Sequence, residues 1–163
     1  MGSESLVEEV KYRFRVTQDV VVDTTAYTIS LFRFTSPRPF TAFSAETKRN
    51  CTVQEAEEVV HALKEFFKHV KEAEPCYFLL DTTRTDAFTL AHVQMMATHF
   101  KALRPILETR LVGSVVKYAE EGYDNHLTKM LEKVYTPVRP LAWWEAPGDC
   151  EKFIRHWEAQ LFP

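Results

Sequence analysis

The sequence predicts a single α/β domain with a mixed β-sheet, which starts with an N-terminal antiparallel hairpin and continues as βαβαβα with helices packed on the sheet. Two observations predict it: β-branched and aromatic runs open the chain, and short apolar runs alternate with helix-periodic segments after residue 52. The chain has 163 residues, of which 45% are hydrophobic and 26% charged. No repeat or linker interrupts it, so we expect one domain over 1–163, with a hairpin and long loop in 1–51 and the α/β core in 52–163.

The first fifty residues predict the hairpin and the loop. Residues 11–18 alternate basic and apolar side chains, which is the period of a strand with one wet face. Residues 20–34 are rich in β-branched and aromatic types and predict one or two further strands. Residues 35–51 contain two prolines and many small polar residues, so they predict a loop. Loops longer than about 12 residues in compact domains are often functional.

The α/β core begins at a helix-start signal. Thr52 and Glu55 have the spacing of a capping box, and the helix that follows presents a polar face that we expect to be solvated. Because strands connected through helices enter a sheet in the same direction, the later strands should pair in parallel. The other expected elements are a buried strand over 76–80, a helix over 87–107, a buried strand over 110–118, a helix over 122–135, a strand over 139–146 and a final helix carrying Phe153, Ile154, Trp157 and Leu161. The polar face of the helix that follows Thr52 carries Glu57, His61, Lys64, Glu65 and Lys68.

Charge and cysteine content argue against several classes of protein. The net charge is −3 and the basic residues form no long tract, so nucleic acid is not an expected partner. The start of the chain lacks the pattern of a secretory signal, and no window is long and apolar enough to span a membrane. The three cysteines are far apart in the sequence, which favours reduced thiols. We therefore expect a cytoplasmic protein that is not an integral membrane protein.

Three stretches carry a resemblance to a known fold: "YFLLDTT" (77–83), "RLVGSVVKYAEEGYDNHLTKMLEKVYTP" (110–137) and "VRPLAWWEAPGDCEKFIRHW" (138–157). Their order resembles the STAS fold of anti-sigma-factor antagonists and the related CRAL-TRIO lipid-binding superfamily, over about residues 52–162. The resemblance implies a STAS-like binding domain. Antagonists of this type carry an Asp-Ser-Ser-Gly-like turn whose serine is phosphorylated. Here the turn reads Asp86-Ala87-Phe88-Thr89, so the usual phosphorylation switch is not expected.

Asp81 and Asp86 are candidate binding residues with a structural alternative. Ligands of open α/β sheets bind beyond the carboxyl ends of strands, where the amides of a following helix attract anions. Alternatively, Asp81 ends the strand while Asp86 caps the next helix. Thr85 and Thr89 are candidate phosphorylation sites, and Thr89 is also a candidate binding residue.

The histidines do not predict a metal site. His92 and His99 are seven residues apart, whereas helical metal ligands are usually three or four apart, so we expect both at an interface or the edge of the core. His126, near Asp124 and Glu121, forms either an acid/base cluster or a solvated helix start. None of the familiar nucleophile, phosphate-binding or zinc-protease motifs occurs, so no catalytic residue, metal or cofactor is predicted.

Aromatic residues supply the remaining candidates. Phe40 and Phe43 lie in the predicted loop. Trp143 and Trp144 are adjacent in a predicted strand and should point to opposite faces, so that one joins the core and the other meets a helix, a ligand or a partner. The alternative is that both are buried.

These observations lead to three functional hypotheses. The first is a non-enzymatic protein-interaction module, acting as a scaffold or in signalling. It binds a protein partner through the loop around Pro37 to Phe43 and one face of the sheet or helices. A homo-oligomer is compatible with it. The second is a carrier of a lipid or small apolar ligand, with a pocket between helices and sheet lined by Phe78, Met96 and Phe100. The third, an enzyme of unknown class, has no supporting group of residues.

Overall fold

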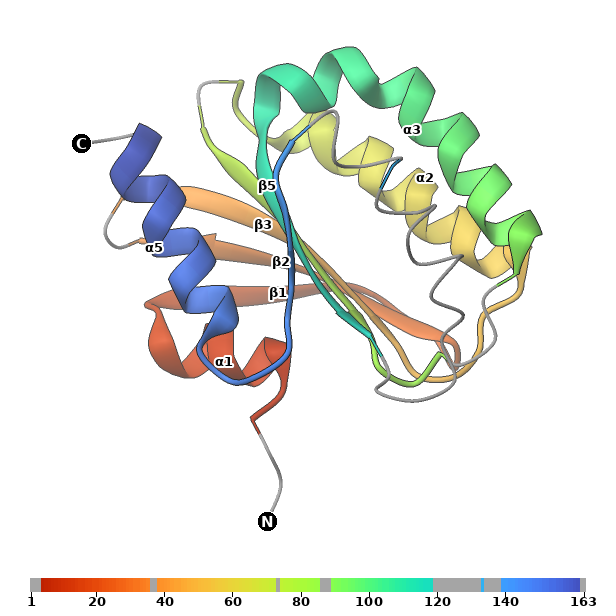
Figure 1. Cartoon of the computed structure of the whole chain (residues 1–163), viewed down its shortest axis with the longest axis horizontal. Helices are drawn as coiled ribbons and strands as arrows, with labels where there is room; N and C mark the ends of the chain where they lie inside the picture. The colour runs from red at the N-terminus through yellow and green to blue at the C-terminus, as the bar shows by residue number, and fades with distance from the viewer. Residues whose placement is uncertain are drawn as a thin grey trace.

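A computed structural model describes residues 4–35, 38–72, 74–85, 89–118, 133 and 139–161 of the chain. Its centre is one six-stranded sheet in the order β1-β2-β3-β4-β5-β6, antiparallel from β1 to β3 and parallel from β3 to β6. Helices α1 and α5 cover one face of this sheet, and α2 and α3 cover the other (Figure 1). The predicted fold class is confirmed. The strands are β1 (Val16–Asp23), β2 (Tyr27–Phe34), β3 (Phe40–Thr47), β4 (Cys76–Thr82), β5 (Leu111–Tyr118) and β6 (Leu141–Trp143); the helices are α1 (Leu6–Arg13), α2 (Val53–His69), α3 (Leu90–Arg110) and α5 (Asp149–Leu161).

Helix α1 includes residues 11–13, which the sequence pattern predicted to begin a strand. The Ser5 hydroxyl accepts a hydrogen bond from the Glu8 amide at 3.1 Å, and the Glu8 carboxylate accepts one from the Ser5 amide at 3.3 Å. This capping box satisfies amides that the first turn leaves unpaired. Leu6 and Val10, one turn apart, are both fully buried. The strand predicted over residues 11–18 therefore begins only at Val16.

The predicted loop over residues 35–51 is wrong, because its central part is β3. This strand pairs with β2 in antiparallel register, Phe34 opposite Phe40, and with β4 in parallel register, Thr41 opposite Cys76. Six of its eight residues are buried. A strand that is covered on both faces shows no polar alternation, and the neighbouring prolines concealed this one further.

The signals in the α/β core are confirmed more closely. Thr52 caps α2: its hydroxyl accepts from the Glu55 amide at 3.1 Å, and the Glu55 carboxylate accepts from the Thr52 amide at 3.0 Å. The buried strands predicted over 76–80 and 110–118 are β4 and β5. Helix α3 is capped by Thr89 rather than by Asp86, which lies outside the described residues. The helix predicted over 122–135 also lies outside them, apart from Lys133.

Two hydrophobic cores lie on the two faces of the sheet. The core under α2 and α3 contains Phe43 and Phe78, and the core under α1 and α5 contains Phe40 and Tyr77. Gly113 in β5 allows α5 to pack closely, since a Cβ atom there would lie 2.6 Å from the ring of Phe153. Among the helices of the described residues, none has both the length and the apolar character needed to cross a membrane.

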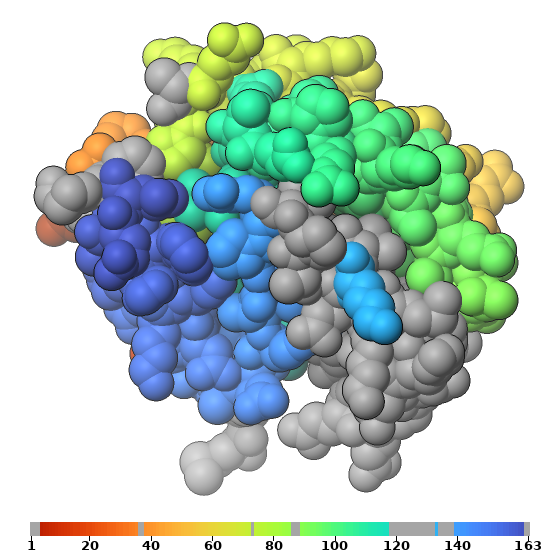
Figure 2. All heavy atoms as spheres, turned by 45° about the horizontal axis from the view of Figure 1, so that its top comes forward, coloured from red at the N-terminus to blue at the C-terminus, as the bar shows by residue number. Residues whose placement is uncertain are grey.

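The space-filling view shows α3 and α5 as separate parts of one side of the molecule (Figure 2). The residues of α3 run from the upper middle to the right of this view in green, and α5 lies at the left in dark blue. The two helices cover opposite faces of the sheet (Figure 1).

Candidate functional site

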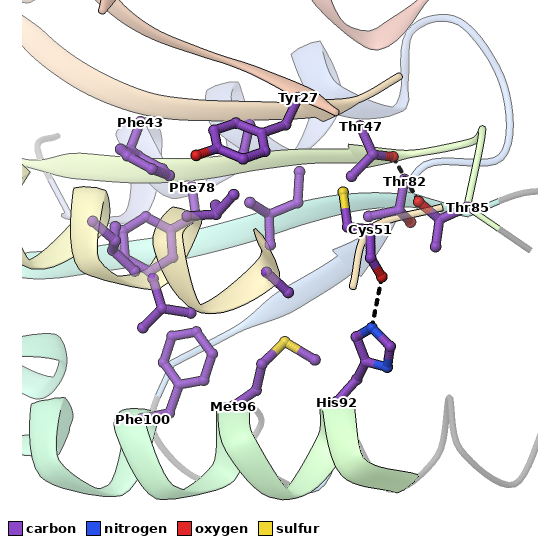
Figure 3. Close-up of a pocket in the computed structure, with 16 residues that line it drawn as sticks. Tyr27, Phe43, Thr47, Cys51, Phe78, Thr82, Thr85, His92, Met96 and Phe100 are labelled. Atoms are coloured by element: carbon purple, nitrogen blue, oxygen red, sulfur yellow. Dashed lines mark hydrogen bonds between the residues drawn. The ribbon is translucent and has the colours of Figure 1, made fainter. Parts of the chain in front are cut away.

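A pocket of about 110 Å³ lies between the sheet and helices α2 and α3. The sheet contributes Tyr27, Phe43 and Phe78, and α3 contributes Met96 and Phe100 (Figure 3). Phe43 and Phe78 reach the pocket because alternate residues of β3 and β4 point toward α2 and α3, and Met96 and Phe100 lie one turn apart on α3. Phe78, Met96 and Phe100 are the three residues that the carrier hypothesis placed in such a pocket, and all three line it.

The pocket is aromatic at one end and bears hydroxyl groups at the other. Figure 3 shows Phe43, Phe78 and Phe100 together, with the threonines on the opposite side. The Thr85 hydroxyl donates to the Thr47 hydroxyl at 2.8 Å, and the Thr82 hydroxyl donates to the carbonyl of Lys117, also at 2.8 Å. A hydroxyl that donates one bond retains acceptor lone pairs. The threonine end of the pocket can therefore accept a hydrogen bond from a ligand.

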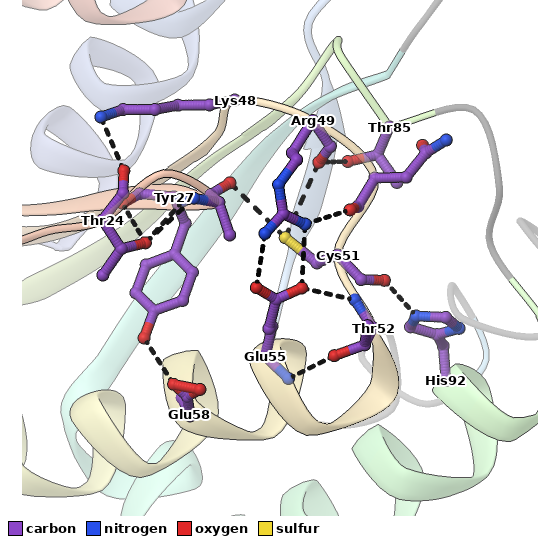
Figure 4. A network of polar contacts seen from close by, with 12 residues as sticks. Thr24, Tyr27, Lys48, Arg49, Cys51, Thr52, Glu55, Glu58, Thr85 and His92 are labelled. Atoms are coloured by element: carbon purple, nitrogen blue, oxygen red, sulfur yellow. Dashed lines mark hydrogen bonds and ion pairs between the residues drawn. The ribbon is translucent and has the colours of Figure 1, made fainter.

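The hydroxyl end is held by the segment between β3 and α2 (Figure 4). The Arg49 guanidinium donates to both carboxylate oxygens of Glu55, at 3.0 and 2.8 Å, and this pairing lowers the pKa of Glu55 to about 2. The Tyr27 hydroxyl donates to Glu58 of α2 at 3.1 Å. Bidentate pairs of this kind fix geometry as well as contributing energy. The segment is thus tied to α2, and β2 is tied to the same helix.

His92 connects the same segment to the start of α3. Its Nε2 lies 2.8 Å from the carbonyl oxygen of Cys51, which can only accept, so Nε2 carries the proton. Nδ1 is then the acceptor for the Thr89 hydroxyl at 2.7 Å. His92 is 6% exposed and lines the pocket. An interface or the edge of the core was expected for His92, and its ring joins the starts of α2 and α3.

The cysteine thiols are poor candidates for nucleophiles. Cys51, Cys76 and Cys150 are free and buried, and Cys51 lines the pocket. Burial raises the pKa of Cys51, raises that of Cys76 to about 12, and raises that of Cys150 well above the ordinary value. Because the thiolate is the reactive form, these groups are inert near neutral pH.

Asp81 does not face the pocket. Leu80 and Thr82 line it, so the residue between them points to the opposite face of the sheet. Asp81 is 6% exposed, and its carboxylate accepts hydrogen bonds from the amide and the hydroxyl of Thr83. This arrangement is the strand-ending role given as the structural alternative. Burial raises the pKa of the neighbouring Glu46, and the negative charge of Asp81 raises it further.

The two candidate phosphorylation sites differ in accessibility. Thr85 is 5% exposed and its hydroxyl is bonded within the pocket wall. Thr89 is exposed, but its hydroxyl caps α3. A kinase acting on Thr85 would therefore have to open the pocket, whereas a phosphate on Thr89 would replace a helix cap.

The aromatic candidates lie mainly in the cores. Phe40 is fully buried and stacks on Phe34, with ring centroids 4.1 Å apart, whereas Phe43 points to the other face and lines the pocket. Trp144 follows β6 directly, is 7% exposed and belongs to the core under α1 and α5. Trp143 is partly buried, and alternation places it toward the other face. Neither Phe40 nor Phe43 offers its side chain to a protein partner at the surface.

One group of polar residues was not recognised in the sequence. Glu57 and His61 on α2 lie beside His99 on α3, although the first two were assigned to a solvated face. The spacing of four between Glu57 and His61 was the available signal. The contribution of His99 from another helix had no signal in the sequence. The cluster predicted around His126 lies outside the described residues.

Comparison with known proteins adds no assignment. No protein-family model, no curated protein and no solved structure matches this chain.

Proposed function

We propose that this protein is a non-enzymatic binding protein for a small apolar molecule, or for one apolar group of a larger molecule. The observation that carries the proposal is the apolar pocket beneath α2 and α3. Engineered cavities of about 150 Å³ lined by apolar side chains bind benzene. At about 110 Å³, this pocket suits a single small ring or a short branched alkyl group.

Packing energetics support a ligand. Protein interiors are close-packed, and a residual void costs about 24 cal/mol per Å³. A void of 110 Å³ would therefore cost up to about 3 kcal/mol, an upper figure because this pocket is partly open. An apolar group that enters the pocket restores these contacts and leaves water at the same time.

The lining also restricts the chemistry of the ligand. Among the described residues that line the pocket, none is a lysine, arginine, aspartate or glutamate. Burying a charged group without a partner is strongly unfavourable. The ligand is therefore uncharged where it is buried, with at most a hydroxyl that donates to Thr47, Thr82 or Thr85.

We retain the STAS-like assignment within this proposal. What supports it is the antiparallel start of the sheet (β1 to β3) followed by alternating helices and parallel strands, together with the three stretches that carry the resemblance. A cytoplasmic location is part of the same proposal and rests on three free, buried thiols. The protein-interaction hypothesis loses its aromatic contacts, because Phe40 and Phe43 are both buried.

A titration with three probes of similar size tests the proposal. Benzene, phenol and benzoate are added to the full chain, and binding is followed by amide chemical shifts in two-dimensional NMR. We expect saturable shifts around Phe78 and Met96 with benzene and phenol, and none there with benzoate because of its charge. Equal binding of all three probes outside the pocket, or no saturable binding, would disprove the proposal.

A further inference from the structure

Glu57, His61 and His99 form a cluster on the outer side of the contact between α2 and α3. Glu57 and His61 are four residues apart on α2, so their side chains lie on one face of the helix. His99 Nε2 lies 2.9 Å from a Glu57 carboxylate oxygen, and the His61 and His99 rings meet edge to face with centroids 5.3 Å apart. The three potential ligand atoms all lie within 4.8 Å of one another.

We propose that these three residues bind a divalent transition-metal ion of the zinc type, which bridges α2 and α3. Two imidazoles and one carboxylate are a ligand set that zinc commonly uses, with a fourth position left for water. This site is separate from the apolar pocket and does not depend on the function proposed for it.

The geometry requires only side-chain movement. Zinc bonds of about 2.1 Å in a tetrahedral arrangement place the ligand atoms about 3.4 Å apart. Glu57 and His99 are already closer than this, at 2.9 Å. His61 is exposed, so its ring can rotate toward the other two without disturbing the core.

Lys64 determines which ring nitrogen of His99 accepts a hydrogen bond in the metal-free protein. Its ammonium nitrogen lies 2.8 Å from His99 Nδ1 and can only donate, so Nδ1 accepts and Nε2 carries the proton directed at Glu57. A metal on Nε2 takes the place of that proton, and Nδ1 then becomes the protonated nitrogen. Lys64 must then move away, because its ammonium group and the protonated Nδ1 are both donors. The lysine therefore opposes metal binding.

This relationship predicts a substitution that strengthens the site. In Lys64→Gln the amide oxygen can accept from protonated Nδ1, and a positive charge near the metal is removed. Residues that orient metal-binding histidines in this way change affinity by about 10- to 100-fold. We expect Lys64→Gln to tighten zinc binding about tenfold.

Isothermal titration of zinc chloride into the full chain, freed of metal by a chelator, tests the proposal. We expect one zinc per chain in the wild type and affinities at least about tenfold weaker in His61→Gln, Glu57→Gln and His99→Gln. The matched control is His69→Gln, an exposed histidine of the same helix, about 12 Å further along its axis. Cobalt(II) absorption in the visible region provides an independent measure of coordination by these side chains.

Circular dichroism of each variant shows whether it is folded. If His99→Gln does not fold, the exposed His61 and the Lys64 variant decide the question. The proposal is overturned if the wild type binds no zinc, or if His61→Gln and His69→Gln bind it equally well. It is also overturned if Lys64→Gln weakens binding.

Discussion

The Glu9 carboxylate accepts a hydrogen bond from the indole nitrogen of Trp144 at 2.8 Å, which joins the first helix to the end of the last strand. Glu9 is fully buried and also accepts from the amides of Gly148 and Glu151, at 2.6 and 2.7 Å. These amides lie at the start of α5, where the helix dipole favours a negative charge. A buried carboxylate is thus satisfied by three donors from the far end of the chain.

Replacement of Glu9 should be costly. In Glu9→Ala the three donors lose their acceptor, and we expect the free energy of unfolding to fall by about 3 kcal/mol or more. Urea denaturation measures the change. The control is Lys11→Ala on the exposed side of α1, expected to change stability by no more than about 0.5 kcal/mol. A loss below about 1 kcal/mol in Glu9→Ala would contradict this role.

Two alanines of β3 distinguish the pocket from the closed core. Ala45 lines the pocket, whereas Ala42 is fully buried on the opposite face. We expect Ala45→Ile to fill the pocket, to keep the stability within about 1 kcal/mol and to abolish benzene binding. Ala42→Ile should overpack the core and cost about 1–3 kcal/mol. Equal destabilisation by the two substitutions in thermal unfolding would contradict the presence of usable space beside Ala45.

Glu158 should make the protein less stable as the pH rises. This residue is 4% exposed, and burial raises its pKa above the ordinary value of 4.5, although the hydrogen bond from Tyr77 opposes the shift. Between the unfolded and the raised folded pKa, the folded state binds more protons than the unfolded state. The stabilising contribution is therefore complete below the ordinary value and is lost as the pH rises through the raised one.

Glu158→Gln removes this titration while keeping an acceptor for the Tyr77 hydroxyl. We expect the urea midpoint to fall less in the variant than in the wild type as the pH rises above the ordinary value of 4.5. Some dependence should remain, because burial also raises the pKa of Glu46. Parallel pH profiles for the wild type and the variant would show that Glu158 does not titrate in this way.

Gly113→Ala should loosen the contact between β5 and α5. The added Cβ would lie 2.6 Å from the Phe153 ring and 3.0 Å from the Pro140 carbonyl oxygen. We expect a loss of about 1–3 kcal/mol in chemical denaturation. Phe153→Leu in the same chain relieves the ring contact and should recover part of this loss. If the double variant is no more stable than the sum of both losses predicts, the ring contact is not the cause.

Local signals in the sequence were sufficient for the elements that depend on local interactions. The capping box of Thr52 and Glu55 marks the start of α2 because both partners lie within one helical turn. The apolar runs of β4 and β5 are typical of strands covered on both faces, whatever helices cover them. The carrier hypothesis could also place Phe78, Met96 and Phe100 together, because helical and strand periodicity decide which side each residue faces.

The tertiary structure alone decided the features that depend on distant partners. β3 is a strand because β2 and β4 pair with it on either side. Its own residues show no strand pattern. The burial of Glu9 depends on donors more than a hundred residues away in sequence. His99 meets Glu57 because α2 and α3 pack side by side on the sheet, and no spacing within either helix encodes that contact. Sequence patterns thus determined the elements of the α/β core that have local signals, whereas packing determined β3 and which polar groups meet.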